Sequence, residues 1–543
     1  MSVRISFLGG LGEVGRNCAS VEIDGRLALI DCGLMFPEED MLGVDLVLPD
    51  FTSIIERRKD VECVILTHGH EDHIGALAYF LRAVPVPIYG TELAVSFARS
   101  RILEAGLEPD LRPVPLGKWT TAGPFKFQLV GVSHSVPQGA AVALDTEEGI
   151  VLHSGDFKLD PTPIDGKPTD LPTFAELGKR GVKLLLSDST NAEVPGFVPS
   201  ESSLGPSLYE LIVESHGRVI TACFASHLHR VQQIVNAAVD DGRSFAFLGR
   251  SMLKNTEIAK DLGLLDLPED RLLDIDELLK LPPERTAIIS TGSQGEPFAA
   301  LSLMASGEHR FVDLTPEDTV IISAKPIPGN ETRVSRVING LLRKGATVFH
   351  GNNSNVHVSG HAAQEELKTF INVVRPDALV PVHGEYRHLN AHAKLATQMN
   401  VPNVILAEDG DAVSLTNGVL KHHRNAIPCD YIYVDGGELG DVREDVLRDR
   451  RQLADDGVVV ITVGVNRRNG EILIGPDVDS HGLTDDPKEI LDAASQAVVA
   501  ELGNIKYPTD LDTLRRHVRK SAAKVIRKRI DRRPVVLPVV IES

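Results

Sequence analysis

Short apolar runs separated by turns rich in Gly, Asp and Pro make up the first two hundred residues of the chain. The runs at 3–10, 27–33 and 61–70 are rich in β-branched residues and predict strands. Between them, the apolar spacing at 76–84 and 92–106 predicts helices. Several predicted strands end in His, Asp or Ser, which is the usual layout of an α/β active site built on loops at the edge of a rigid sheet.

The pattern changes near residue 203, where helices begin to alternate with buried apolar strands, as they do in βαβ units. This alternation predicts a second α/β domain inserted into the first. Strand segments that end in histidine then resume, and a last unit ends in a basic helix and a strand. The predicted organisation is a first domain in two parts, 1–203 and 356–425, an inserted domain, 204–355, a linker, 426–457, and a C-terminal domain, 458–543.

Composition narrows the class of protein. No apolar run reaches the roughly 20 residues that a membrane-spanning helix needs, and the N-terminus lacks the features of a signal peptide, so we expect a cytoplasmic protein with no membrane partner. The five cysteines are odd in number and form no C-x-x-C pair, which argues against a disulfide framework. The net charge of −20 argues against a general nucleic-acid coat protein, but it leaves room for a nuclease with a local basic groove.

The strongest chemical signal is the segment Thr67–His73, which directly follows an apolar strand and carries three histidines and two acids. Histidine and carboxylate are natural ligands of Zn²⁺ and Mn²⁺. The H-x-H part can present two imidazoles to one ion, and the following D-H pair can turn to a second. Two ions about 3.5–4 Å apart suit phosphodiester cleavage. The alternative is a polar turn with solvated histidines, which this spacing disfavours.

Further ligands are needed, and suitable residues stand at later strand ends. His134, Asp156 and His383 each follow an apolar run, and Asp31 closes another. Taken singly, each of these residues is as well explained by capping or by a place in the core. Taken together with the first motif, they predict one metal centre.

These segments resemble a known superfamily. The segment 68–73, with Asp31 and the segments 133–135 and 154–156, resembles the metallo-β-lactamase superfamily. The inserted domain and the segments 186–190, 359–362 and 381–385 resemble the β-CASP nucleases within it, and most closely the bacterial ribonuclease J family. The resemblance covers essentially the whole chain. It implies an α/β (α+β) fold with an αββα metallo-β-lactamase sandwich, an inserted α/β β-CASP domain and a small α/β C-terminal domain.

The resemblance also implies two divalent metal ions per chain, Zn²⁺ or Mn²⁺, since the same ligands accept both. The residues implied to hold one ion are His68, His70 and His134, those implied to hold the other are Asp72, His73 and His383, and Asp156 is implied to bridge the two.

Three further residues are implied to assist the ligands in catalysis, together with the ligand Asp72. Asp31 would orient the ligands, and Asp188 would brace the centre. His361 would face the scissile phosphate, where an imidazole can stabilise charge or protonate the leaving 3′-oxygen.

Two segments are implied to bind the nucleotide in the cleft between the domains. They comprise Ser226, His227 and Leu228 in the first, and His357, Val358, Ser359, Gly360 and His361 in the second. A Ser-Gly turn at a helix start presents N–H groups to a phosphate; the alternative for Ser359 is simple N-capping. The turns at 249–251 and 292–294 are weaker candidates for a pocket that grips a 5′-phosphate.

Three other features have competing interpretations. Residues 10–15 match G-x-G-x-x-G, but a hairpin pattern follows them instead of a helix, so we expect a tight loop near the metal site rather than a dinucleotide site. The basic stretch 514–533 predicts a surface helix, with RNA contact or a subunit interface as alternatives. Asp45 and Asp435 are a hypothesis for a separate structural cation.

These inferences predict a metal-dependent ribonuclease that combines 5′→3′ exonuclease and endonuclease action in mRNA decay and rRNA maturation. The expected partners are single-stranded RNA, preferably with a 5′-monophosphate, and further copies of the chain in a homodimer or homotetramer. The alternatives are a DNA-directed β-CASP nuclease and a non-catalytic RNA-binding subunit. A small-molecule hydrolase is disfavoured, because the inserted domain gives the cleft a second wall that suits a polymer.

Overall fold

The chain folds into two compact units in this computed structural model, which describes residues 2–436, 438–439, 442–466 and 468–542. Unit 1 comprises residues up to 36 together with 46–432, and unit 2 comprises 37–45 and the residues from 433 onward. Each unit has a hydrophobic core of its own.

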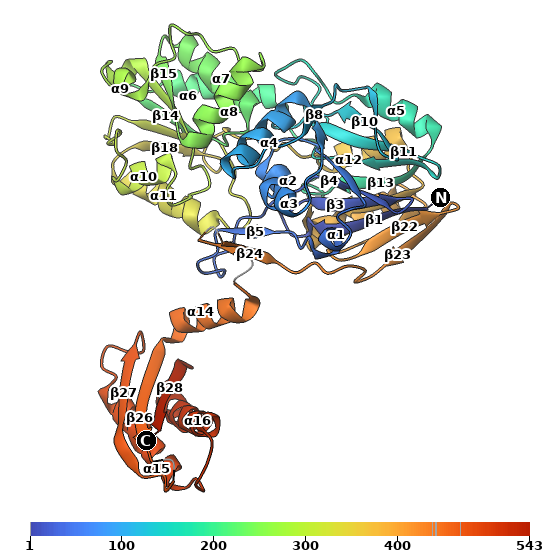
Figure 1. Ribbon diagram of the computed structural model, residues 1–543. Coiled ribbons are helices and arrows are strands. Elements are labelled where there is room, and N and C mark those ends of the chain that lie inside the picture. Colours follow the sequence, from blue (N-terminus) through green and yellow to red (C-terminus); the bar gives the residue numbers. More distant parts are fainter. Residues whose placement is uncertain (1, 437, 440–441, 467, 543) are drawn as a thin grey trace. The chain divides into compact units, whose positions relative to one another are not determined.

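Two mixed sheets form the first domain of unit 1 (Figure 1). The first has the order β23 (Val419–His423), β22 (Ala412–Thr416), β1 (Ser2–Gly9), β3 (Cys18–Ile23), β4 (Arg26–Ile30), β6 (Val61–Ile65), β7 (Ile88–Gly90), β8 (Leu111–Pro113). The second has the order β21 (Asn403–Val404), β19 (Ala378–Val382), β13 (Val182–Asp188), β12 (Gly149–His153), β11 (Ala140–Thr146), β10 (Phe125–Gly131), β9 (Trp119–Ala122). Strands β4, β6, β7 and β8 are parallel, and so are β12, β13, β19 and β21, so their carboxyl ends meet at one edge of each sheet.

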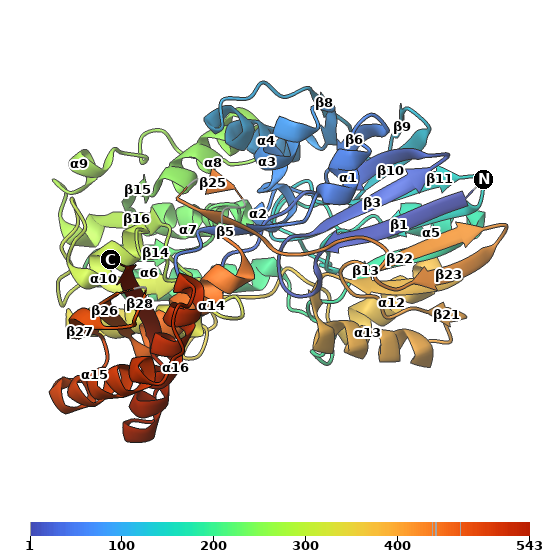
Figure 2. The same cartoon turned by 60° about the horizontal axis from the view of Figure 1, so that its bottom comes forward.

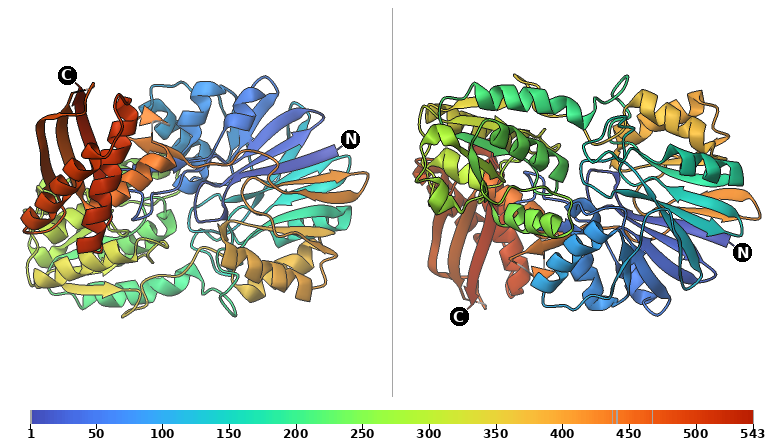
Figure 3. Two further views of the ribbon diagram at one scale, coloured as in Figure 1. Left: turned by 90° about the horizontal axis from the view of Figure 1, so that it is seen from below. Right: turned by 90° about the horizontal axis from the view of Figure 1, so that it is seen from above.

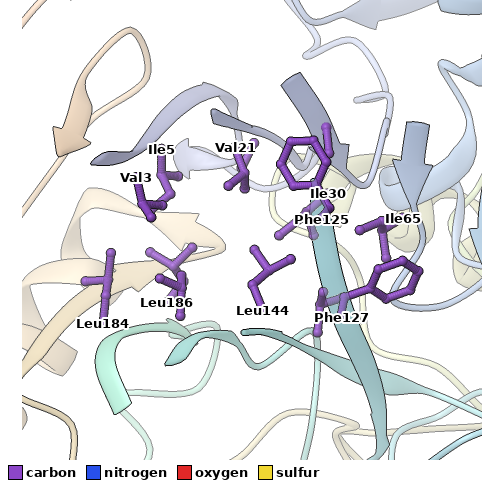
Figure 4. Close-up of a cluster of buried hydrophobic side chains, with 14 of the residues drawn as sticks. Val3, Ile5, Val21, Ile30, Ile65, Phe125, Phe127, Leu144, Leu184 and Leu186 are labelled. Atoms are coloured by element: carbon purple, nitrogen blue, oxygen red, sulfur yellow. The ribbon is translucent and has the colours of Figure 1, made fainter. Parts of the chain in front are cut away.

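The two sheets pack face to face through one buried apolar layer (Figure 4). Because side chains alternate along a strand, residues two apart point to the same face. The layer includes Val3, Ile5, Val21, Ile30 and Ile65 of the first sheet and Phe125, Phe127, Leu144, Leu184 and Leu186 of the second. Burying each such side chain contributes about 1.5–3 kcal/mol, so this layer fixes how the strand ends of the two sheets face each other.

Helices cover the outer faces of the sandwich. The helix α4 (Glu92–Glu104) lies beside β7 and β8, and α3 (Leu77–Ala83) packs against α4. The second sheet is covered by α5 (Leu171–Arg180), α12 (Gln364–Val374) and α13 (Tyr386–Gln398), through a core that includes Phe174 and Phe370. In Figures 2 and 3 the blue helices and the orange pair α12 and α13 lie on opposite sides of the strands. This arrangement confirms the predicted αββα sandwich.

The inserted domain of unit 1 is a wholly parallel sheet with helices. Its strand order is β15 (Ser244–Leu248), β16 (Thr286–Ser290), β14 (Val219–Ala222), β17 (Thr319–Ile322), β18 (Thr347–His350). Its helices are α6 (Leu204–Val213), α7 (Leu228–Asp240), α8 (Arg250–Asp261), α9 (Ile275–Leu278), α10 (Ala300–Ser306) and α11 (Glu331–Arg343). The near-continuous apolar strands reflect burial on both faces, as expected for βαβ units.

The chain passes between the two domains of unit 1 at two places, and a fully buried arginine joins them. Arg230 on α7 donates to both carboxylate oxygens of Glu201, at 2.6 and 3.0 Å, on the outgoing segment. It also donates to the carbonyl oxygen of Val356, at 3.0 Å, on the returning segment, and to Ser323. This cluster therefore ties the inserted domain to the sandwich.

Unit 2 is built on a three-stranded sheet of order β27 (Ile472–His481), β26 (Val458–Val465), β28 (Val535–Glu542). The helices α15 (Lys488–Gly503) and α16 (Leu511–Arg529) pack on this sheet. The buried face of α16 carries Leu514, Val518, Ala522 and Ile526, so its basic residues form the other face.

Part of the predicted linker is regular structure. Residues 444–456 form the helix α14, with Leu447 buried. The segment EDVLRDRRQLADD is so rich in charge that its apolar spacing is faint, which is why the sequence pattern did not reveal this helix.

Candidate metal centre

The seven predicted ligands lie at the carboxyl ends of strands from both sheets. They follow β6 (His68, His70, Asp72 and His73), β10 (His134), β12 (Asp156) and β19 (His383). The structure brings all seven together, in overlapping groups whose ligating atoms lie within 4.8 Å of one another.

One group comprises His68, His70, His134 and Asp156. The Nδ1 atom of His70 lies 3.0 Å from Nε2 of His68 and 3.2 Å from Nε2 of His134. Burial and the neighbouring imidazoles lower the pKa of His68 and of His70 well below the usual range, and burial lowers the pKa of His134 to about 3. The three rings are therefore neutral, with lone pairs that converge.

A second group comprises Asp72, His73, Asp156 and His383. The Oδ2 atom of Asp156 lies 3.3 Å from Nε2 of both His73 and His383, and Oδ2 of Asp72 lies 3.5 and 3.8 Å from the same two atoms. Burial alone would lower the pKa of His73 and of His383, but the surrounding carboxylates, Asp156 foremost, raise both. This half of the centre therefore favours bound positive charge.

Asp156 belongs to both groups. Its Oδ2 atom also lies 3.6 Å from Nε2 of His68 and 3.8 Å from Nε2 of His134. Burial would raise its pKa, but the imidazoles of His383, His73 and His68 hold the pKa of Asp156 well below its usual range. It is thus a shared carboxylate between two sets of ligating atoms.

The donor atoms fit transition-metal ions. Ligands about 2.1 Å from a tetrahedral ion stand about 3.4 Å apart, close to the separations of 3.0–3.3 Å seen between neighbouring donor atoms here. The chemistry of imidazole nitrogen and carboxylate oxygen suits Zn²⁺ and Mn²⁺. A cation in each group would offset the electrostatic repulsion between the converging nitrogen lone pairs and carboxylate oxygens.

Asp31, for which the resemblance implied an orienting role, contacts the centre from behind. Its Oδ2 atom lies 2.7 Å from Nδ1 of His73, and its Oδ1 atom accepts from the backbone N–H of Thr67 at 2.8 Å. Both Asp31 (φ 60°) and His383 (φ 57°) adopt the left-handed region, which is uncommon for residues other than glycine. Such strain persists where surrounding structure holds it, typically at functional sites.

Asp188 and His361 form a hydrogen-bonded pair at the edge of the centre. Nδ1 of His361 lies 2.8 Å from Oδ2 of Asp188, whose Oδ1 accepts from the N–H and hydroxyl of Thr190. Burial alone would lower the pKa of His361, but Asp188 raises it to about 9. His361 therefore holds a proton beside the predicted ligands. Its Nδ1 is engaged by Asp188, and among the residues that the structure describes no hydrogen bond to its Nε2 is seen.

Two glycines make room for the ligands. An added Cβ at Gly33 would lie 1.6 Å from the carbonyl oxygen of Asp72, and one at Gly360 would lie 2.9 Å from the ring of His134. Gly360 also accepts a hydrogen bond on its carbonyl from Nδ1 of His134, at 2.8 Å. The predicted substrate residue Gly360 thus positions the predicted ligand His134, a role that only the folded structure reveals.

The predicted substrate segments lie in the inserted domain and at the return to the sandwich. His227 precedes the first residue of α7, Leu228, whose N–H donates to the carbonyl of Ser226 at 2.9 Å. Nε2 of His227 lies 3.6 Å from Oε1 of Glu201, and burial lowers the pKa of His227 to about 4.

The second segment corrects one expectation. Helix α12 begins at Gln364, so Ser359 and Gly360 lie before the helix and neither present its N-terminus nor cap it. The start is fixed instead by Glu366, whose carboxylate accepts from the N–H of Ala363 at 2.9 Å. The Ser359 hydroxyl accepts from the Asn191 amide at 2.8 Å and from the N–H of His361 at 3.2 Å. In the same segment His357 is partly buried and Val358 is buried.

The turns at 249–251 and 292–294 stay predictions for a pocket that grips a 5′-phosphate. Gly249 precedes α8 and Gly292 follows β16, both with positive φ, and Gln294 is held by the carbonyl of Lys325. In unit 2, Asp435 pairs with Arg450 at 2.5 Å, and Asp45 accepts from the N–H of Gly436 at 2.9 Å. Since both carboxylates have protein partners, and no cluster of ligating side chains includes them in the described ranges, the hypothesis of a structural cation is not supported.

Comparison with known proteins gives the family. Family models match four successive parts of the chain: the metallo-beta-lactamase superfamily at 11–193, the Ribonuclease J beta-CASP domain at 216–341, the Zn-dependent metallo-hydrolase RNA specificity domain at 350–406 and the Ribonuclease J C-terminal domain at 445–543. Ribonuclease J of Mycobacterium tuberculosis is 43% identical over 99% of this chain and 97% of its own length. The chain belongs to the ribonuclease J family.

Other members of the ribonuclease J family agree over the same length. Ribonuclease J of Thermus thermophilus is 40% identical over 100% of this chain and 95% of its own, and Ribonuclease J2 of Bacillus subtilis is 36% identical over 100% and 99%. A solved structure described as a protein of unknown function from Enterococcus faecalis has a TM-score of 0.55 at 17% identity, covering 76% of this chain and 100% of that chain, and it supports the fold alone. Across the residues described, no helix has both the length and the apolar character to cross a bilayer.

Proposed function

We propose that this ribonuclease J family member hydrolyses phosphodiester bonds of single-stranded RNA at the centre built around Asp156. The observation that carries the proposal is the convergence of four histidines on one shared carboxylate. One of the four, His383, lies in the part of the sandwich that matches an RNA specificity domain. One ion would be held by His68, His70, His134 and Asp156, and the other by Asp72, His73, His383 and Asp156. We infer Zn²⁺ or Mn²⁺ from the donor set.

Bound ions would supply a hydroxide near neutral pH and would neutralise charge that develops on phosphorus. The protein's own groups would do the rest. Asp31 fixes the orientation of His73, and Asp188 that of His361. His361 would hold a proton at Nε2 and give it to the leaving 3′-oxygen, which leaves a 5′-phosphate on the other product.

The direction of cleavage, the preferred RNA end, the cellular role and the oligomeric state are inferred from the resemblance to the ribonuclease J family. We infer combined 5′→3′ exonuclease and endonuclease action on RNA with a 5′-monophosphate, in mRNA decay and rRNA maturation in the cytoplasm, by a homodimer or homotetramer. With the domain boundaries inferred above, we propose that the sandwich forms one wall of the substrate cleft. The inserted domain would form the other wall and would contribute Ser226, His227 and Leu228.

Matched substrates test this proposal. The protein is incubated with one single-stranded sequence as 5′-monophosphorylated RNA, 5′-triphosphorylated RNA and 5′-monophosphorylated DNA, each with Mn²⁺ and with Zn²⁺. We expect the monophosphorylated RNA to be degraded fastest from its end, the triphosphorylated RNA more slowly, and the DNA to remain. Equal cleavage of DNA would favour the DNA-directed alternative, and RNA that is bound but uncut would favour the non-catalytic one.

A further inference from the structure

The Gly10–Asn17 loop, which carries the G-x-G-x-x-G pattern, lies beside the metal centre. After it the chain enters β3, so the loop starts no helix. Gly10 has φ 93°, and an added Cβ there would lie 2.5 Å from Oδ1 of Asn17, so the two ends of the loop touch. Glycine at this position allows the two ends of the loop to lie in contact.

Asn17, at the end of the loop, contacts two residues of the second ligand group. Its backbone N–H donates to the carbonyl of Asp72 at 3.0 Å, and its side-chain amide donates to Oδ2 of Asp72 at 3.2 Å. The same amide nitrogen lies 3.1 Å from Nε2 of His73. Asn17 is buried, so these contacts are shielded from bulk water.

The start of the loop contacts the third residue of that group. Its two-residue strand β2 (Leu11–Gly12) pairs in parallel with β20 (Gly384–Glu385), which directly follows His383. The N–H of Gly384 donates to the carbonyl of Gly10 at 3.3 Å. This pairing restrains the backbone that holds His383 in its left-handed conformation. Within the described ranges, no hydrogen bond joins the loop to His68, His70 or His134.

A buried arginine locks the loop in place. Nε of Arg16 donates to Oε1 of Glu13 at 2.6 Å, and Nη2 donates to Oδ2 of Asp409 at 3.2 Å. The guanidinium carbon lies 4.3 Å from the ring centre of Tyr431, whose hydroxyl donates to Oε2 of Glu13 at 2.8 Å. The other oxygen of Asp409 accepts from the N–H of Leu11 at 2.9 Å. Both ends of the loop are thus tied to one buried cluster.

We propose that Asn17, on the loop locked by Arg16, is a positioning residue for the ion held by Asp72, His73 and His383, and not for the ion held by His68, His70 and His134. The inference rests on the proposed two-ion function. Supporting residues of this kind typically contribute about 10–100-fold to metal affinity. The loop would act by holding three ligands from separate segments at one spacing.

Site-resolved metal occupancy tests the proposal. Crystals of the full chain and of Asn17→Ala are equilibrated with limiting Zn²⁺, and the occupancy of each position is read from anomalous scattering, alongside competition with a chelator in solution. We expect Asn17→Ala to weaken the ion near His383 by about 10–100-fold and to leave the other ion at wild-type occupancy. Excess Mn²⁺ should restore RNA cleavage, because Asn17 does not touch the reacting atoms.

Three further variants sharpen the comparison. Gly360→Ala, which pushes on the ring of His134, should weaken the other ion instead, whereas Gly351→Ala, where an added Cβ meets nothing within 4 Å, should weaken neither. Tyr431→Phe, which removes one hydroxyl from the lock, should give a smaller loss in the same direction as Asn17→Ala; it serves if Asn17→Ala does not fold.

Either of two results would overturn the proposal: wild-type affinity for both ions in the Asn17→Ala and Tyr431→Phe variants, or equal loss of both ions. A wild-type chain that binds no ions or cuts no RNA would instead count against the proposed function, so the two failures are told apart by the wild-type arm.

Discussion

Replacing Asp156 by asparagine is expected to slow RNA hydrolysis by at least about 10³-fold. The Oδ2 atom of Asp156 lies 3.3–3.8 Å from a ligating nitrogen of four histidines, two in each ligand group. An amide of the same shape is neutral and presents N–H groups on one side, so it cannot serve both ions. Metal ions supply several kcal/mol of transition-state stabilisation, and each 1.36 kcal/mol is about tenfold in rate.

The rate is measured on labelled 5′-monophosphorylated RNA, with the metal content and the circular dichroism spectrum of the same sample. A matched control is Asp145→Asn, since Asp145 pairs with Lys126 and Arg180 away from the centre. The control should cut RNA at the wild-type rate. Turnover by Asp156→Asn within tenfold of wild type would mean that the reaction does not use this carboxylate.

Replacing Arg230 by methionine is expected to lower the free energy of unfolding by about 3–5 kcal/mol, because breaking a buried ion pair leaves an uncompensated charge. Arg230 is fully buried and donates to both oxygens of Glu201, to Ser323 and to Val356. The exposed control Arg57→Met, which loses pairs with Glu22 and Asp60, should cost no more than about 1 kcal/mol. Denaturant unfolding measures both; equal effects would show that the buried cluster does not hold the domains.

The loss of stability in Arg230→Met is expected to depend on pH. Burial would raise the pKa of Glu201, but His227 and Arg230 hold it well below its usual range. A carboxylate with a depressed folded-state pKa contributes stability above its unfolded pKa of about 4.3, and that stability is lost as the pH falls through the folded pKa. The difference in stability between wild type and Arg230→Met should therefore be largest near neutral pH and should shrink in acid.

The metal centre was predictable where its chemistry is local. Four of the predicted ligands lie within the segment 68–73, and the others follow apolar runs, so residue type and strand position marked them as candidates; the resemblance implied how they divide between two ions. Short runs rich in β-branched residues likewise predicted strands of the sandwich, among them β1, in which Val3 and Ile5 share the buried face. The change of pattern near residue 203 predicted the inserted domain, and the family resemblance implied what kind of domain it is.

What the sequence did not reveal depends on contacts between distant segments. Asn17 meets Asp72 and His73 only after β1, β3 and β6 are paired in one sheet, and Arg230 meets Glu201 across a junction of two domains. No residue type or spacing marks such pairs along the chain. The glycines of residues 10–15 did predict a tight loop, but they did not indicate which side chain the loop would place against the metal centre.

The helix start expected near Ser359 is wrong, because a buried residue inside the helix sets its start further along the chain. A serine before an apolar run suggested a helix start, yet the chain runs on through Ala362 and Ala363 before α12 begins at Gln364. The carboxylate of Glu366 satisfies the N–H groups of Ala363, Leu159 and Val198, so a buried acid from inside the helix sets its start and ties three segments together. A rule that places helix starts from residue type and spacing alone cannot detect a capping group that also binds distant segments.

The metal dependence of RNA cleavage, measured on the preparation in which the metal is counted, tests the central claim most directly. Metal-free protein should leave 5′-monophosphorylated RNA intact, and activity should return on addition of Mn²⁺ or Zn²⁺ and saturate at about two bound ions per chain. Full activity in protein that carries no transition metal, or activity that does not respond to the metal bound, would contradict the account.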